Sequence, residues 1–373
     1  MSFSLNGTTG LTFPDASTQA TAATGFGFKN RIINGAMMID QRNAGAATAS
    51  SYAGYTVDRW NISQTVTGKV VMQQNAGSVT PPTGFKNYLG ATSQSAYSLL
   101  SGDYYLIGQQ IEGYNVSDLG WGTASAQTIT VSFWVRSSLT GTFGAAIVNN
   151  GYDYSYPFSY TINAANTWEQ KTVTIAGPTS GTWTTDNTAG LRIYFSLGTG
   201  TTYSGTAGAW TGSFKVSTTG ATSVVGTNGA TFYITGVQLE KGSTATSFDY
   251  RPYGTELALC QRYFEMSYGI GTVPATATFL DMYMSTSNAG SSTTGFIETL
   301  LPYKVSKRAA ATLTFYDSAG TSGKCTRQVV GVSATAGQNI AIDQFGLNGA
   351  TVYSSGTSSA TGFFYHFTAS AEL

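Results

Sequence analysis

Residues 127–138 read QTITVSFWVRSS, and residues 230–240 read ATFYITGVQLE. In both stretches polar and apolar residues alternate with a period of two, which indicates a β-strand with one buried face. Similar segments occur at 141–150, 167–176 and 189–198, and clusters of Gly, Asn, Thr and Pro separate them. Many short strands without a helical period predict a β-sandwich.

The composition agrees with an all-β fold. Only 10% of the residues are charged, against about 25% in typical soluble domains, whereas aromatic residues make up 13%. Because the chain has aromatic residues and a net charge of zero, unlike disordered segments, we expect it to fold. The neutral balance argues against nucleic acid as a partner. No apolar run approaches the roughly 18 residues that a membrane span requires, so no membrane insertion is expected.

The chain divides into segments with different patterns. They are an N-terminal segment with too few apolar residues for a core of its own (1–28), a large jelly-roll β domain (29–250), a helical connector (251–264) and a smaller C-terminal β-sandwich domain (265–373). In the connector, Leu257, Cys260 and Phe264 follow the spacing of one helix face. The C-terminal domain contains further alternating segments, which predict strands at 275–284, 295–306, 310–320, 325–335, 338–346 and 361–373.

Several stretches resemble bacteriophage tail fibres. LTFPDASTQATAA (11–23) is similar to a leader of tail-fibre and tail-tip proteins, where it attaches the fibre tip to the preceding part of the tail. YRPYGTELALCQRYF (250–264) resembles a phrase that joins a jelly roll to a terminal domain in phage tail proteins. The stretch at 302–325 and the ending FYHFTASAEL (364–373) resemble fibre tip domains. The resemblance implies an attachment segment at 1–28 and a homotrimeric fibre.

The large domain resembles a carbohydrate-binding module of the xylanase-associated group. TVSFWVRSS (130–138), NTWEQKTVTI (166–175) and ATFYITGVQLEKG (230–242) match three of its strands in order. The resemblance implies a sugar-binding jelly roll. Where some members carry acidic residues that help hold a structural calcium, this chain has Thr235 and Gly236, so the calcium site does not carry over and no metal or cofactor is expected. We expect the tryptophans of these alternating strands to be core residues: Trp60, Trp134 and Trp168.

Catalytic motifs are missing from the sequence. His366 is the only histidine, and its place in an aromatic strand predicts a packed or inter-subunit side chain rather than a general base. Five loop carboxylates are candidates for glycan cleavage, but nothing in their spacing pairs them: Asp103, Glu112, Asp118, Asp153 and Asp186. We therefore expect no enzyme. Cys260 and Cys325 are expected to be free, buried thiols.

Aromatic residues give candidates for a sugar site, because flat rings stack on the C–H faces of pyranoses. Tyr152, Tyr154 and Tyr156 are spaced by two, so in a strand they would project from one face. They would form a stacking platform or pack against a neighbouring strand or subunit. Trp183 and Trp210 stand among turn residues and are candidate loop-tip rings.

These observations predict a phage tail-fibre adhesin that attaches the virion to host surface polysaccharide without catalysis. Its further partners would be two copies of itself and a tail or baseplate protein bound through residues 1–28. The N-terminus MSFSLNGTTG lacks the pattern of a secretory signal, as expected of a virion tail protein assembled in the host cytoplasm. The alternatives are a structural baseplate or head fibre protein and a glycan-cleaving tail spike. Polar segments 286–294 and 349–360 are read as loops, either surface linkers or contacts with the host.

Overall fold

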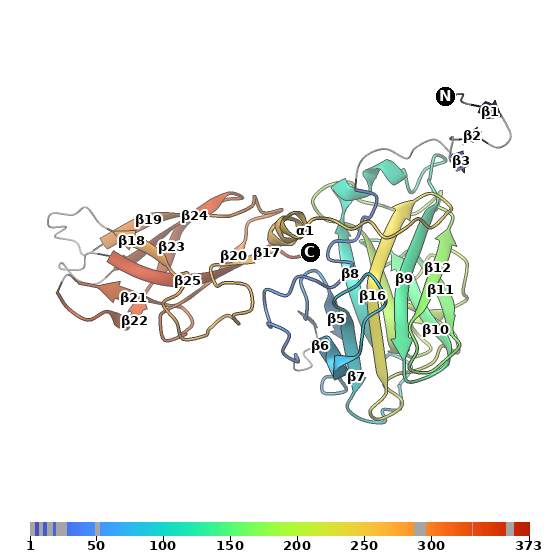
Figure 1. The fold of residues 1–373 in the computed structure, drawn as a ribbon, viewed down its shortest axis with the longest axis horizontal. Coiled ribbons are helices and arrows are strands. Elements are labelled where there is room, and N and C mark those ends of the chain that lie inside the picture. The colour runs from blue at the N-terminus through green and yellow to red at the C-terminus, as the bar shows by residue number, and fades with distance from the viewer. Residues whose placement is uncertain are drawn as a thin grey trace.

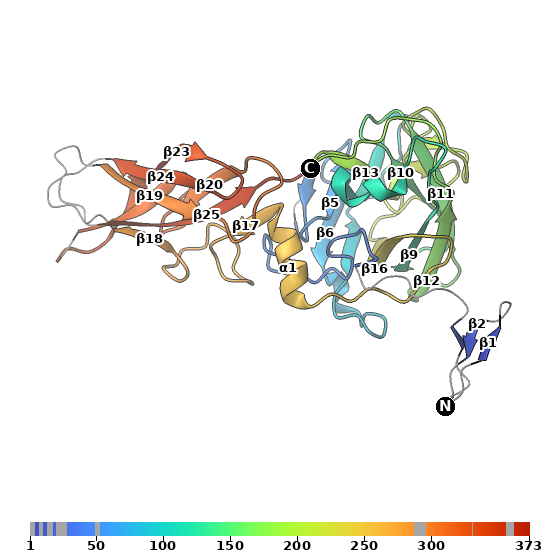
Figure 2. The same ribbon diagram turned by 90° about the horizontal axis from the view of Figure 1, so that it is seen from above.

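The computed structural model describes residues 28–48, 53–286, 296–329, 331–355 and 362–373, together with three short N-terminal strands: β1 (Ser4–Asn6), β2 (Gly10–Thr12) and β3 (Thr18–Gln19). Two β domains follow, and the second extends from one side of the first (Figures 1 and 2). We call residues 28–241 the jelly-roll domain and residues 264–373 the C-terminal domain. In the described part of the chain, no helix is long and apolar enough to cross a membrane.

The jelly-roll domain is an antiparallel sandwich of two sheets (Figure 1). The six-stranded sheet has the order β11 (Ser155–Ile162), β10 (Gly141–Val148), β13 (Ala189–Thr199), β8 (Tyr104–Glu112), β5 (Asn61–Gln64) and β4 (Ala53–Tyr55). The five-stranded sheet has the order β12 (Glu169–Ile175), β9 (Ile129–Ser137), β16 (Thr231–Lys241), β7 (Leu89–Ser93) and β6 (Val70–Gln74). The prediction of an all-β chain with a jelly-roll sandwich is confirmed.

The core lies between the two sheets and is built from alternate residues of each strand. Phe133 of β9 contacts Phe195 of β13 and Tyr160 of β11, each with ring centroids 4.9 Å apart. The rings meet edge to face, which is the arrangement that their quadrupoles favour. Trp60 is also fully buried in this core, as predicted.

Trp134 and Trp168 are not core residues, so that prediction was wrong. Trp134 lies on the outer face of the five-stranded sheet, where a bulge of β16 places Gly236 beside it. Trp168 is half-buried at the start of β12, and its indole N–H donates to the carbonyl of Thr80. The loop that includes the short 3-10 turn η1 (Ala76–Ser78) covers this face with the ring of Tyr88, 5.5 Å from Trp168.

Short elements complete the jelly-roll domain. Two 3-10 turns follow β8 at one end of the sandwich: η2 (Gly113–Asn115) and η3 (Ser117–Leu119). A small parallel pair, β14 (Ser204–Gly205) and β15 (Ser217–Thr218), lies over β10 and β13. It contributes to a second apolar cluster on the outer face of the six-stranded sheet, with Val216 and Tyr194 buried there.

The C-terminal domain also consists of two β layers. One sheet is centred on β25 (Gly362–Ser370) and includes β17 (Phe264–Met266), β18 (Tyr283–Thr286), β20 (Thr312–Tyr316), β21 (Lys324–Gln328) and β22 (Thr335–Asn339). The other has the order β19 (Phe296–Pro302), β24 (Gly349–Ser355) and β23 (Ala341–Phe345). Phe315, Tyr365 and Val352 are buried between them.

Two expectations for this domain were wrong. The strand predicted at 275–284 is mostly irregular, and only Tyr283 and Met284 belong to β18. The segment 349–360 is not simply a loop, because its first seven residues form β24. Residues 287–295 and 356–361 lie outside the described residues.

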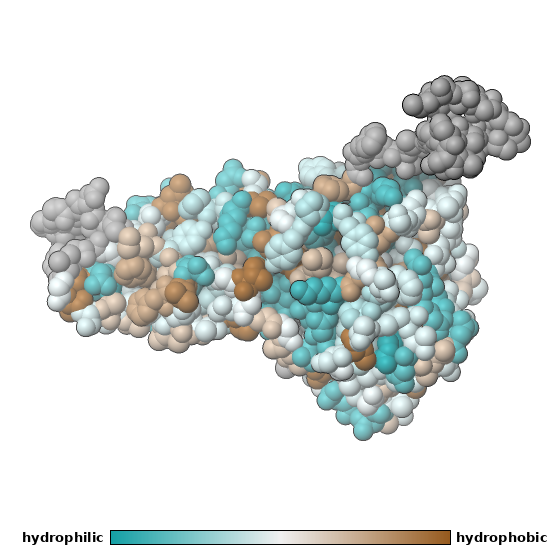
Figure 3. Space-filling model, viewed as in Figure 1, coloured by the Kyte–Doolittle hydropathy of each residue, from teal (hydrophilic) through white to brown (hydrophobic). Residues whose placement is uncertain are grey.

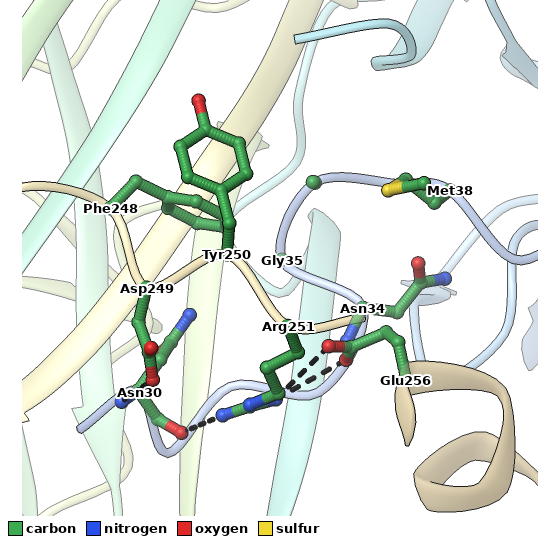
Figure 4. Close-up of a pocket in the computed structure, with 10 residues that line it drawn as sticks. Asn30, Asn34, Gly35, Met38, Phe248, Asp249, Tyr250, Arg251 and Glu256 are labelled. Carbon is green, nitrogen blue, oxygen red and sulfur yellow. Dashed lines mark hydrogen bonds and ion pairs between the residues drawn. The ribbon is translucent and has the colours of Figure 1, made fainter. Parts of the chain in front are cut away.

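The single helix of the described chain, α1 (Tyr253–Gln261), lies at the junction of the two domains (Figure 1). Its start is held by Arg251, which pairs with Glu256 at 3.3 Å and also donates to the carbonyl of Asn30 (Figure 4). The amide of Asn34 donates to the same Glu256 carboxylate. The YRPYGTELALCQRYF stretch (250–264) therefore attaches helix α1 to Asn30 and Asn34 at the start of the jelly-roll domain.

The predicted helical stripe of the connector holds only in part. Cys260 is fully buried and Leu257 packs against the same apolar cluster, but Phe264 lies beyond the helix as the first residue of β17. The helix ends where Glu112 accepts two hydrogen bonds from Arg262, at 2.6 and 2.9 Å, and one from the Tyr263 hydroxyl.

Buried charges complete the junction. Glu372, next to the end of β25, forms ion pairs with Arg42 and Arg59 of the jelly-roll domain. The guanidinium of Arg59 stacks on the Tyr263 ring, 3.6 Å from its centroid. Arg308 donates to the backbone carbonyls of Glu372, Ala371 and Asn187. These contacts tie the C-terminal domain directly to the sandwich.

Asp58 gives this junction a testable pH dependence. Its carboxylate is fully buried beside Arg42, and burial raises its pKa to about 6. An unfolded Asp has a pKa near 3.9, so the folded chain binds the Asp58 proton more tightly than the unfolded chain does. The free energy of unfolding therefore falls as the pH rises from the unfolded pKa to the folded pKa. Relative to an Asp58→Asn variant, wild type should lose up to ~1 kcal/mol of unfolding free energy per unit between about pH 4 and 6. Denaturant unfolding across this range tests it; a flat or opposite difference would refute it.

Candidate functional site

Five aromatic side chains gather at the end of the sandwich that carries η2 and η3. This aromatic cluster consists of Trp121, Tyr154, Tyr156, Trp183 and Trp210. Trp183 lies edge-on to Trp121 and to Trp210, with centroids 4.7 and 5.5 Å apart. Tyr154 stacks on Trp210 with an interplanar angle of 17°. Three separate loops and the start of β11 thus supply one contiguous set of rings.

Four of the five side chains of the aromatic cluster have their polar atom hydrogen-bonded within the protein. The indole N–H groups of Trp121, Trp183 and Trp210 each donate to a backbone carbonyl, at 2.8, 3.2 and 2.8 Å. The Tyr154 hydroxyl lies 2.6 Å from the Ser180 hydroxyl. These bonds fix the ring orientations before a ligand arrives, so binding would lose little side-chain entropy.

Two glycines allow the loops to approach this closely. Gly122 and Gly181 have φ of +82° and +87°, a region that other residues rarely adopt. A Cβ on Gly122 would lie 2.7 Å from the carbonyl oxygen of Gly181 and 3.2 Å from the Trp183 ring. The Gly–Trp–Gly and Gly–Thr–Trp sequences are therefore part of the site's construction.

A pocket of about 250 Å³ opens beside the aromatic cluster, and Trp121 and Trp183 form part of its wall. Pockets for small ligands measure roughly 300 to 1,000 Å³, so this one suits a ligand near the lower limit. Its polar lining consists of hydroxyl side chains, from Ser117, Thr123, Thr184 and Thr185, together with backbone. Among the described residues that line it, none carries a charge.

The candidate tyrosines do not form the row of three that their spacing suggested. Tyr152 lies in a turn with φ of +57°, and β11 begins only at Ser155, so the strand geometry does not reach Tyr152. Its ring packs over the Arg192 guanidinium at 4.1 Å and contacts Phe214 at 5.1 Å. Tyr152 is thus separate from the aromatic cluster.

Four of the five candidate rings do come together: Tyr154, Tyr156, Trp183 and Trp210. The two tryptophans are half-buried against the sandwich core rather than projecting at loop tips. Sequence reasoning missed Trp121, which is 8% exposed. The same signal could have found it, because Trp121 stands between Gly120 and Gly122 as the other two stand among turn residues.

The carboxylates considered for catalysis are dispersed, each with its own partners. Glu112 is in the domain junction, Asp103 accepts from Thr65, Tyr97 and Leu100, and Asp118 pairs with Arg31. Asp153 accepts from Asn149, and Asp186 accepts from Thr188. Among these contacts none brings two of the five carboxylates together. In the described ranges, no group of three or more His, Cys, Asp or Glu side chains could hold a metal.

The remaining reactive side chains are packed inside the C-terminal domain or the junction. His366 is fully buried, stacks on Tyr268 with centroids 3.7 Å apart, and bonds the Ser267 hydroxyl at 2.9 Å. Burial lowers its pKa, so the neutral ring is favoured. The prediction of a packed histidine is confirmed. Cys260 and Cys325 are both free and buried, as predicted.

Comparisons with known proteins found similarity to solved structures only. No protein-family model and no curated protein matches the chain. A solved structure with a similar fold is the enzymatically active domain of bacteriophage CBA120 tailspike protein 4, at 14% identity and a TM-score of 0.31, covering 57% of this chain and 21% of that one. The match therefore spans about a fifth of that solved chain's length.

Sugar-binding modules are also among the similar structures. The family 11 carbohydrate-binding module of Clostridium thermocellum, in complex with a mixed-linked tetrasaccharide, has 14% identity and a TM-score of 0.27 and covers 53% of this chain and 97% of that one. The N-terminal cellulose-binding domain of Cellulomonas fimi β-1,4-glucanase C has 12% identity and a TM-score of 0.24, with 43% and 80% covered.

Proposed function

We propose that this protein is a phage tail-fibre adhesin that attaches the virion to host surface glycans without catalysis. The observation that carries the proposal is the uncharged pocket beside the aromatic cluster, whose wall contains Trp121 and Trp183. Sugar recognition needs a ring face for the C–H groups and neutral hydrogen-bonding groups for the hydroxyls. The pocket combines both, in an orientation fixed by the indole hydrogen bonds.

The attachment role draws on the sequence resemblances and on the surface of the C-terminal domain. Residues 1–28 would bind a tail or baseplate protein. Most of the large apolar side chains that the described chain exposes lie in the C-terminal domain (Figure 3), among them Leu280, Leu300 and Phe345 at 76%, 68% and 61%. Exposed apolar surface commonly marks protein contacts, which supports contact with another chain here; the homotrimer itself is what the tail-fibre resemblance implies.

Multimeric assembly would also solve an affinity problem. A single weak sugar site with millimolar affinity contributes about 4 kcal/mol, too little to hold a virion on a cell. Three pockets on one fibre would bind a repetitive polysaccharide together, and avidity would raise the overall affinity by about 10² to 10⁴.

The proposal predicts that Trp183→Ala weakens binding to host cells by about tenfold or more, because the ring face that receives the sugar is lost. Trp168→Ala is the matched control, since Trp168 is also half-buried with its N–H on a backbone carbonyl but lies directly before β12 and does not line the pocket. Binding of labelled protein to host cells measures the effect. Equal loss in both variants, or none in Trp183→Ala, would contradict the site.

Two further readouts separate the alternative functions. Free protein should compete with virions for adsorption; a structural baseplate or head fibre protein would not. Incubation with host polysaccharide should produce no new reducing ends; their appearance would identify a glycan-cleaving spike instead.

A further inference from the structure

We infer that the pocket beside the aromatic cluster selects uncharged sugars and rejects acidic ones such as uronic and sialic acids. The inference rests on the proposed glycan-binding function and names the class of sugar. It follows from the charges in and around the pocket, taken in three steps.

The first step is the lining. Its side chains are apolar or carry hydroxyl groups, and the described residues that form it include no Lys, Arg or His. Three of the hydroxyls already donate to backbone carbonyls: Ser117 to Tyr114 at 3.2 Å, Thr123 to Gly120 at 2.7 Å and Thr184 to Ala189 at 2.6 Å. Their oxygens therefore present lone pairs to a ligand, which suits the donor hydroxyls of a neutral sugar and not a carboxylate.

The second step concerns the two cations that pair with a carboxylate in the lining segment. Asp118 lies between the lining residues Ser117 and Leu119, and its carboxylate binds Arg31 at 2.9 Å and Lys241 at 3.7 Å. Arg31 also donates to the carbonyl of Asn115, and Lys241 to that of Asp118 itself. Their positive charge is thus directed to protein acceptors.

The third step is a carboxylate on the opposite loop. Asp186 follows the lining residue Thr185, is exposed, and accepts two hydrogen bonds from Thr188, which lower its pKa. No Lys or Arg in the described chain forms an ion pair with Asp186. The guanidinium of Arg308, which binds the neighbouring Asn187, donates to the three junction carbonyls. An anion entering the pocket would therefore lose water, gain no countercharge and approach a negative group.

The test uses matched pairs of sugars that differ by one carboxylate. Saturation-transfer NMR with the full chain would compare methyl glucoside with methyl glucuronide and methyl galactoside with methyl galacturonide, and immobilised neutral and uronic-acid polymers would extend the comparison. We expect the neutral member of at least one pair to bind at least about tenfold more tightly than its acidic partner. Equal or tighter binding of the acidic member would overturn the inference and leave the proposed function standing. Absence of binding to every sugar and polymer would overturn both.

Removing the Asp118 carboxylate should shift the preference of the pocket toward acidic sugars. Asp118→Asn leaves Arg31 and Lys241 without their carboxylate beside the pocket, so affinity for the uronide should rise about threefold to tenfold at low ionic strength and return toward wild type in high salt. Binding of the neutral glycoside should change less than twofold. Asp343→Asn, an exposed carboxylate on β23 of the C-terminal domain, is the control and should leave both affinities unchanged. An unaltered uronide affinity in Asp118→Asn would contradict the role of charge.

Discussion

Replacing Glu372 by Ala is expected to lower the free energy of unfolding by about 3 to 5 kcal/mol. The Glu372 carboxylate bridges Arg42 and Arg59, and the Arg59 side chain is only 1% exposed. Removing the carboxylate leaves buried guanidinium charge without its partner, which costs far more than losing a surface ion pair. Denaturant unfolding of the full chain measures the change.

The matched control is Glu298→Ala, in which an exposed glutamate of the same domain is truncated. It should change stability by no more than ~0.5 kcal/mol. A Glu372→Gln variant keeps the shape and some hydrogen bonds but not the charge, so its loss should fall between the two. Should Glu372→Ala cost no more than Glu298→Ala, the junction would not depend on this ion cluster.

Replacing Lys307 by Ala is the second change with a large expected effect, again about 3 to 5 kcal/mol. Lys307 and Glu265 are both fully buried, with Nζ 2.6 Å from the carboxylate oxygen, and Nζ also donates to the carbonyls of Gln261 and Val305. Without Lys307, the Glu265 charge would remain in the interior without a cation. Thermal or denaturant unfolding tests the prediction.

A double variant, Lys307→Met with Glu265→Leu, separates the charge effect from packing. Apolar side chains of similar size remove both charges together, so stability should recover most of the loss of the single variant. If the double variant is as unstable as Lys307→Ala, the hydrogen bonds to Gln261 and Val305 matter more than charge balance, and the explanation through an uncompensated Glu265 is wrong.

The strands that were predictable from the sequence are those in which polar and apolar residues alternate, whatever covers the outer face. β9 and β16 alternate in this way, and β16 does so although its residues from Phe232 to Glu240 are all buried. The central strand β8 was not predicted, although it has nine residues. Its outward face packs under other parts of the chain, and its inward Gln109 bonds both backbone groups of Ile33, so polar and apolar residues fall on both faces.

The candidate site was predictable in its residue types and not in its geometry. Turn residues on both sides of a tryptophan indicate a loop that carries a large aromatic ring. Three such loops converge here. Their convergence depends on contacts between segments distant in sequence, such as Trp121 with Trp210, which no local pattern encodes. Tyr152 failed because a period of two has meaning only inside a strand, and the turn at Tyr152 precedes β11.

The ion cluster at the junction also sets an order of events in folding. Its bonds join Glu372 to Arg42 and Arg59, residues separated by 330 and 313 positions. During synthesis the sandwich strands emerge long before β25. Arg42 and Arg59 therefore lack the Glu372 carboxylate until the end of the chain has been made. Contacts of such long range form late, because closing the intervening loop is entropically unfavourable. The nascent jelly roll therefore reaches its full stability only when the second domain docks, and newly made chains should stay vulnerable to proteolysis at this surface until then.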